Sequence, residues 1–111
     1  MKTISFKVQG SQPEPYTVTF NNNDGTITAY CTCPAGEHGT HCKHRVRILG
    51  GISKDIVSDN IKEIEVLLSW SSGTALESAV KDYITAEKEY EKANKAFTSA
   101  KKKLNSLFYN K

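Results

Sequence analysis

The chain has few cysteine, methionine and tryptophan residues, and its hydrophobic runs are short. It contains 111 residues, of which three are Cys, one is Met and one is Trp. A membrane-spanning helix needs about 20 consecutive apolar residues, and no signal-peptide pattern opens the sequence. We therefore expect a soluble, cytoplasmic protein without a membrane partner. The length allows one small domain with one extra element, and a domain of this size buries only a modest core.

The scarce cysteines are clustered, and their odd number argues against a disulfide framework. All three lie in the stretch CTCPAGEHGTHCKH, residues 31–44, together with all three histidines. Cys31 and Cys33 are one residue apart, and Cys42 and His44 have the same spacing. Structural zinc takes four nitrogen or sulfur ligands in a tetrahedron. Two close pairs joined by a short glycine-containing loop can surround one ion, which predicts a Zn²⁺ site formed by these four residues.

The fourth ligand has a rival in His41, which is adjacent to Cys42, whereas His38 is expected to be an ordinary loop residue. We favour His44, because paired ligands on one turn recur in zinc sites. Four protein ligands leave no position for water, so the predicted metal is structural rather than catalytic. The alternative is that the thiols are inert, but three cysteines and one histidine rarely have this spacing without a metal.

Alternating apolar and polar residues predict a small antiparallel sheet before the cluster. Strands are expected over residues 4–8, 16–20 and 26–30, since apolar side chains recur there with a period of two. The sequence NNNDG at residues 21–25 is typical of a hairpin turn. The alternation also assigns three aromatic residues to the core: Tyr16, Phe20 and Tyr30. A short helix is expected after His44.

This order of strands, Cys-x-Cys, loop, Cys-x-His and short helix resembles the SWIM-type zinc finger family. The resemblance covers about residues 1–50, and the proline after the second cysteine also fits it, as do the apolar residues Val46, Ile48 and Leu49. Membership would imply a zinc-binding module that contacts DNA or proteins.

Three cations lie close to the second ligand pair and are candidates for contacts with nucleic acid: Lys43, Arg45 and Arg47. Contacts with phosphates supply most of the non-specific affinity of such proteins. The same cations could instead offset the net negative charge that three thiolates leave around one Zn²⁺. The sequence leaves both interpretations open.

The C-terminal segment contains no Gly or Pro from Ala75 onward, and Thr74 with Glu77 has the pattern of a capping box at its start. Apolar residues recur there every seven positions in two series. The first series is Leu76, Tyr83, Tyr90, Phe97 and Leu104, and the second is Ala79, Ala86, Ala93, Ala100 and Leu107. This seam predicts a coiled coil, so we expect a homodimer formed through residues 75–108.

Charge is distributed unevenly along this helix. Residues 75–91 hold two basic and five acidic side chains, whereas residues 92–111 hold six lysines and no acidic residue. An antiparallel pair would place the acidic half of one helix beside the basic half of the other, which favours an antiparallel homodimer. The polarity also suits the helix dipole, and a helix folded back on residues 61–68 is the alternative.

We predict an α+β chain with three parts. A SWIM-like zinc-binding module covers residues 1–52, a short helical connector covers residues 53–73, and a long amphipathic helix covers residues 74–111. In the connector, Asn60 and Glu63 indicate a helix start, and apolar residues at helical spacing are expected to cover the core. These residues are Ile56, Ile61, Ile64 and Leu68.

The predicted function is a zinc-binding interaction module on a dimerisation helix, with DNA as the expected partner. A protein adaptor with a purely structural zinc is the alternative, and a zinc-thiolate redox switch is a minor one. We expect no enzyme. The Cys-His pair has no third orienting group nearby, and the sequence contains neither a phosphate-binding glycine loop nor a paired-carboxylate motif.

Overall fold

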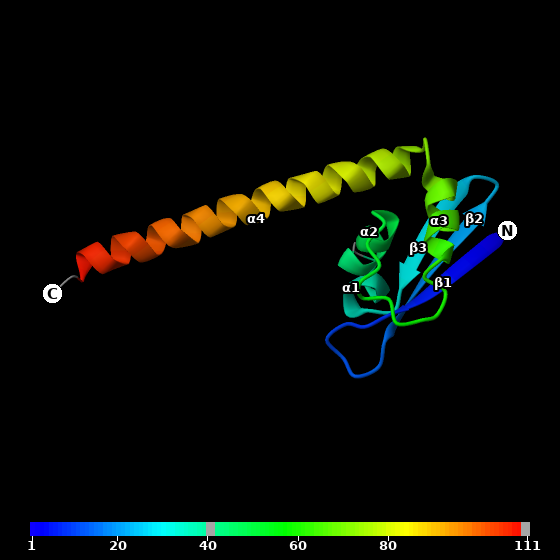
Figure 1. Cartoon of the computed structure of the whole chain (residues 1–111), viewed down its shortest axis with the longest axis horizontal. Helices are drawn as coiled ribbons and strands as arrows, with labels where there is room; N and C mark the ends of the chain where they lie inside the picture. The colour runs from blue at the N-terminus through cyan, green and yellow to red at the C-terminus, as the bar shows by residue number, and fades with distance from the viewer. Residues whose placement is uncertain (40–41, 110–111) are drawn as a thin grey trace. The chain divides into compact units, whose positions relative to one another are not determined.

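The structure is a computed structural model that describes residues 1–39 and 42–109, and it confirms the α+β class. The chain divides into two compact units, Met1–Val80 and Lys81–Lys111. The elements follow one another as shown in Figure 1. They are β1 (Lys2–Val8), β2 (Tyr16–Asn23), β3 (Thr26–Cys31), α1 (Pro34–Glu37), α2 (Lys43–Leu49), α3 (Glu63–Ser71) and α4 (Ala75–Phe108). The division at residues 52 and 73 stays a prediction.

The three strands form one antiparallel sheet in the order β1-β2-β3, and its register sets which side chains enter the core. Phe6 pairs with Val18, and Val18 pairs in turn with Cys31. Because strand side chains alternate between faces, these three residues and Phe20 share the buried face. The rings of Phe6 and Phe20 meet edge to face at 6.2 Å between centroids. The core of the sheet therefore extends to the first cysteine.

The hairpin between β2 and β3 is tighter than the sequence predicts. The strands continue through the asparagines, so the turn consists of Asp24 and Gly25, which have φ values of 52° and 90°. The side-chain oxygen of Asn22 accepts a hydrogen bond from the Gly25 N–H at 2.9 Å. Asp and Gly tolerate positive φ, which explains why the reversal falls at these two residues.

Tyr30 was predicted to lie in the core, which was wrong, because its side chain is 60% exposed. Cys31 faces the core, and adjacent strand residues point to opposite faces, so Tyr30 points away from it. Phe20 is fully buried as predicted, and Tyr16 is partly buried.

The connector adds to the edge of the sheet before its helix begins. Val57 donates its N–H to the Lys7 carbonyl at 2.8 Å, and the Gln9 N–H donates to the Asp55 carbonyl at 2.9 Å. Helix α3 begins later than expected. Ile61 was predicted to lie in this helix and to cover the core, which was wrong, because Ile61 precedes the helix and its side chain is 43% exposed. Asn60 instead uses its amide to bond the Ser5 carbonyl at 2.7 Å and the Glu63 carboxylate at 2.9 Å.

Helix α4 begins with one half of the predicted capping box, while the Glu77 carboxylate bonds Gly73 instead of Thr74, whose N–H donates to the Ser71 carbonyl. The Thr74 hydroxyl accepts a hydrogen bond from the Glu77 N–H, and the Glu77 carboxylate accepts one from the Gly73 N–H, both at 3.3 Å. The helix has 34 residues and is about 51 Å long at 1.5 Å per residue. Among the described helices, none is long and apolar enough to cross a membrane.

Candidate metal centre

The structure brings the four predicted ligands together. The ligand atoms of Cys31, Cys33, Cys42 and His44 all lie within 4.8 Å of one another. All four residues are buried, with exposures between 4% and 9%. Cys31 is the last residue of β3, Cys33 precedes α1, Cys42 precedes α2 and His44 lies in the first turn of α2. One sheet and two short helices therefore meet at the cluster.

The Cys-x-Cys turn directs backbone N–H groups toward sulfur. The Cys33 N–H donates to Cys31 Sγ at 3.5 Å, and the Gly36 N–H donates to Cys33 Sγ at 3.3 Å. Pro34 occupies the start of α1, where a missing N–H has no cost. Hydrogen bonds to sulfur stabilise thiolates, which are the form that binds metal.

Thr32 and Gly36 hold this turn in place. The Thr32 N–H donates to the Thr17 carbonyl at 3.1 Å, while the Thr17 N–H donates to the Thr32 hydroxyl at 2.9 Å. A Cβ at Gly36 would overlap the Cys31 carbonyl oxygen and lie 2.9 Å from Cys31 Cβ. Sequence reasoning identified neither role, although a glycine three residues after the second cysteine is a recognisable signal for a close approach.

The second ligand pair is positioned by α2. Cys42 is the N-cap residue of this helix, and His44 Nδ1 lies 3.8 Å from Cys31 Sγ. The Tyr16 ring packs against the His44 ring at 5.3 Å between centroids and a tilt of 48°. Tyr16 therefore supports the histidine from the sheet, a contact that the sequence pattern did not predict.

Burial and hydrogen bonding give the thiols different acidities. Burial raises the pKa of Cys31 from 9.0 to about 12, so this thiol keeps its proton at neutral pH without metal. Burial also acts to raise the pKa of Cys42, but hydrogen bonds from Arg45, Cys33 and Cys31 together outweigh it and lower that pKa. Burial, aided by Lys43 and Arg47, lowers the pKa of His44, which favours the neutral imidazole that binds metal.

The donor set fits Zn²⁺. Bond lengths of about 2.3 Å to sulfur and 2.0–2.1 Å to nitrogen place two tetrahedral sulfur ligands about 3.8 Å apart and a sulfur about 3.5–3.6 Å from a nitrogen. The 3.8 Å between Cys31 Sγ and His44 Nδ1 is close to, and slightly longer than, that sulfur–nitrogen spacing. Three thiolates and one imidazole are soft and borderline ligands, and all four are buried. The chemistry that zinc supplies in such a closed set is structural, because it crosslinks the ends of the elements.

The two other histidines, His38 and His41, are not among the four clustered ligands that the structure describes. His38 lies in the described part of the chain, follows α1 and is exposed. The predicted rival ligand His41 lies outside the described residues.

The three cations predicted to contact nucleic acid have different surroundings. Arg45 Nη1 donates to the Ala29 carbonyl at 3.0 Å, in addition to its hydrogen bonds with Cys42. Arg47 forms an ion pair with Asp55 at 3.4 Å. Lys43 is exposed. Arg45 and Arg47 therefore serve the zinc module itself, and Lys43 is the member of the trio most open to solvent.

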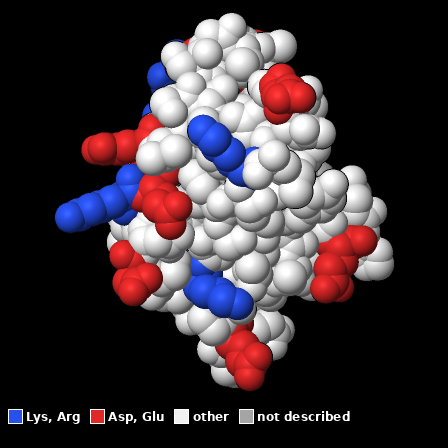
Figure 2. Space-filling view, turned by 90° about the vertical axis from the view of Figure 1, so that its right-hand side faces the viewer, with Lys and Arg blue, Asp and Glu red and all other residues white. Residues whose placement is uncertain are grey.

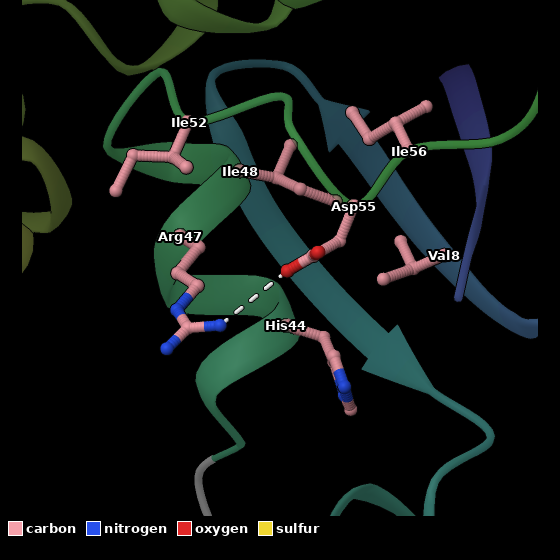
Figure 3. A pocket seen from close by; sticks show the side chains of 7 residues that line it. All are labelled: Val8, His44, Arg47, Ile48, Ile52, Asp55 and Ile56. Carbon is pink, nitrogen blue, oxygen red and sulfur yellow. Dashed lines mark hydrogen bonds and ion pairs between the residues drawn. The ribbon is translucent and has the colours of Figure 1, made fainter. Parts of the chain in front are cut away.

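The Arg47–Asp55 pair borders a small hollow beside His44 (Figure 3). Val8 from β1, Ile48 from α2, and Ile52 and Ile56 from the following segment also line it. The space is about 10 Å³, which is room for about one water molecule. It is too small for an organic substrate or cofactor.

Figure 2 shows one face of the molecule in space-filling form. Lys and Arg side chains on this face are separated from one another and interspersed with Asp and Glu side chains. Such a mixed surface does not concentrate positive potential in the way that phosphate binding favours.

Comparison with protein families agrees with the geometry. Residues 16–50 match the family model described as SWIM zinc finger. The match includes the cluster of donors and both flanking elements, β3 and α2. Comparisons with curated proteins and with solved structures found no match.

Proposed function

Because residues 16–50 carry a SWIM zinc finger, we propose that this chain is a non-catalytic, zinc-stabilised interaction module that dimerises through α4. The metal donors form a closed and buried set, so a substrate has no open coordination position. The zinc crosslinks three elements of a sheet domain that buries few large side chains. This stabilisation is what a small domain needs.

The observation that carries the proposal is the exposed apolar seam of α4. Within the second unit, Tyr90, Phe97, Leu104 and Leu107 are 68%, 61%, 51% and 64% exposed. They fall on one heptad stripe of a continuous helix, which is the pattern of a coiled coil whose partner helix is missing. A stripe of this kind is covered in solution by another helix, and the chain supplies an identical one.

Light scattering after gel filtration tests this dimer. The wild type is expected at twice the chain mass of 12.3 kDa. Ala93→Glu places a charge at the centre of the seam and is expected to give a monomer that still binds zinc. Ser99→Glu adds the same charge off the seam and is expected to leave the dimer intact. A wild-type monomer would refute the proposal.

DNA is a second candidate partner, favoured by a specific arrangement of lysines on α4. Lys88, Lys95 and Lys102 recur every seven residues and are exposed. In heptad terms they occupy the position opposite the seam, so dimerisation leaves them available for contacts with phosphates. Exposed Lys43 adds a similar charge on the zinc module.

Fluorescence anisotropy of labelled duplex DNA, measured across a salt series, tests this candidate. Binding through these lysines predicts that the logarithm of the binding constant falls steeply with the logarithm of the salt concentration. This slope should decrease by about one for each phosphate contact removed. Lys88→Gln, Lys95→Gln and Lys102→Gln in one chain should reduce the slope, and Asn105→Gln on the same helix should not. No binding at low salt would leave the protein-adaptor function.

A further inference from the structure

In the exposed part of the α4 seam, one heptad series has large side chains and the other has mostly small ones, which favours pairing with a second copy of the helix. In the second unit, one heptad series presents Tyr83, Tyr90, Phe97 and Leu104, and the other presents three alanines followed by Leu107. A parallel, in-register pair would stack large residues on large ones and alanine on alanine. Layers of such unequal thickness pack poorly.

We propose that α4 pairs with α4 of a second copy in one antiparallel register, centred at Lys95, which rests on the dimer proposed above. In this register Tyr90 of one chain packs against Ala100 of the partner, and Phe97 packs against the partner's Ala93. In these two central layers each ring meets a small residue, so the layers have similar volumes and the helices approach closely. The end layers pair Leu104 with the partner's Ala86 and Tyr83 with the partner's Leu107. The two-fold axis repeats each contact.

Charges flanking the seam agree with this register. Glu87 of one helix faces Lys101 of the partner, and Glu89 faces the partner's Lys103, so two-fold symmetry gives four opposite-charge contacts. Lys101 already has its ammonium 4.5 Å from the centre of its own Phe97 ring, beside the seam. Glu87 is held on the same flank by the Tyr83 hydroxyl at 3.4 Å.

Other registers lose these contacts. A shift by one heptad toward the N-termini would oppose Leu76 to the partner's Leu107 and would set Val80 beside the partner's Lys101. Val80, however, is 7% exposed and belongs to the first unit, where Leu76 is also partly buried. The opposite shift would face Lys101 with the partner's Asn94, so that its opposite-charge contact is lost. A parallel pair would place Asp82 beside the partner's Glu87, which repel each other. The seam that remains from Tyr83 to Leu107 has its midpoint at residue 95.

The register also fixes the distance between the points at which the two copies of the second unit begin. Residue 81, where the second unit begins, lies 14 residues from the centre, so the two copies of residue 81 are about 42 Å apart along the axis. The two copies of the first unit would therefore be attached to opposite ends of the paired helices.

Zero-length carbodiimide cross-linking of the full, zinc-loaded chain tests the register. Within one straight helix, Glu87 and Lys101 are about 21 Å apart, as are Glu89 and Lys103, so a direct amide between either pair must join two chains. Mass spectrometry of a mixture of ¹⁴N and ¹⁵N chains is expected to find both amides with mixed isotopes. Amides that join other positions in an otherwise intact dimer would overturn the register.

Charge reversal provides a second test that separates the register from dimerisation itself. Glu87→Lys with Glu89→Lys should weaken the homodimer by at least about tenfold, and so should Lys101→Glu with Lys103→Glu. Mixing the two variants should restore a heterodimer. A parallel coil predicts instead that the first variant strengthens its dimer, because Asp82 would then attract the lysine introduced at position 87. Dimers insensitive to both variants would refute the register only, whereas a wild-type monomer would refute the dimer and the register together.

Discussion

Replacement of Gly36 by alanine tests how closely the Cys-x-Cys turn is packed. The added Cβ would overlap the Cys31 carbonyl oxygen and approach Cys31 Cβ to 2.9 Å. Both atoms belong to a metal ligand, so a shift that relieves the overlap also displaces Cys31 Sγ. Overpacking of this kind costs about 1–3 kcal/mol. If that cost falls on the zinc-bound state, the dissociation constant for zinc increases by about 5- to 150-fold.

The assay is a competition between the protein and a chromophoric zinc chelator at pH 7, combined with the absorption spectrum of the Co²⁺ form. Gly36→Ala is expected to weaken zinc binding and to shift the Co²⁺ bands, because a ligand has moved. Gly25→Ala is the matched control, since Gly25 has φ +90° but nothing within 4 Å of an added Cβ. The control should lose about 1–3 kcal/mol of stability through backbone strain while its Co²⁺ spectrum stays unchanged. Wild-type affinity and spectrum in Gly36→Ala would refute the close approach.

Three further results are expected. Zinc binding at pH 7 should release the proton that Cys31 retains with its pKa of about 12, so the affinity for zinc should fall as pH falls. Calorimetry in buffers of different ionisation enthalpy measures the released proton, and finding none would contradict this prediction. Arg45→Gln should raise the pKa of Cys42 by removing side-chain hydrogen bonds. The pH dependence of iodoacetamide alkylation of the metal-free protein measures this pKa, and an unchanged pH profile would contradict the prediction. Leu67→Ala should lower the free energy of unfolding by about 2–5 kcal/mol because Leu67 is 0% exposed, whereas Val66→Ala, at a site 48% exposed, should change it by less than about 1 kcal/mol in the same urea titration.

The sequence was sufficient to predict the metal cluster, because ligand chemistry depends on residue type and spacing. Cys31 and Cys33 precede the loop, and Cys42 and His44 follow it, so any chain conformation that binds one ion must bring the pairs together. The strands and the N-cap role of Thr74 were also predictable, since both depend on local patterns.

Features that depend on long-range packing were not predictable from local patterns. Tyr30 was wrongly assigned to the core because the inward direction of β3 is set by Cys31, and the pairing with Val18 was not known. Ile61 was wrongly placed in a helix because Asn60 uses its amide to bond Ser5, which is 55 positions earlier. The charge of Arg45 was evident, but its hydrogen bonds to Ala29 and Cys42 require the folded chain.

A native mass spectrum of the full chain at neutral pH, recorded with and without a chelator, is the most direct test of a zinc-stabilised module on a dimerisation helix. The expected species without chelator contains two chains of 12.3 kDa, each with one Zn²⁺. The chelator is expected to remove both ions and to shift the charge states upward, because the zinc-binding units unfold. A zinc-free monomer with the same charge states in both conditions would contradict both the metal centre and the dimer.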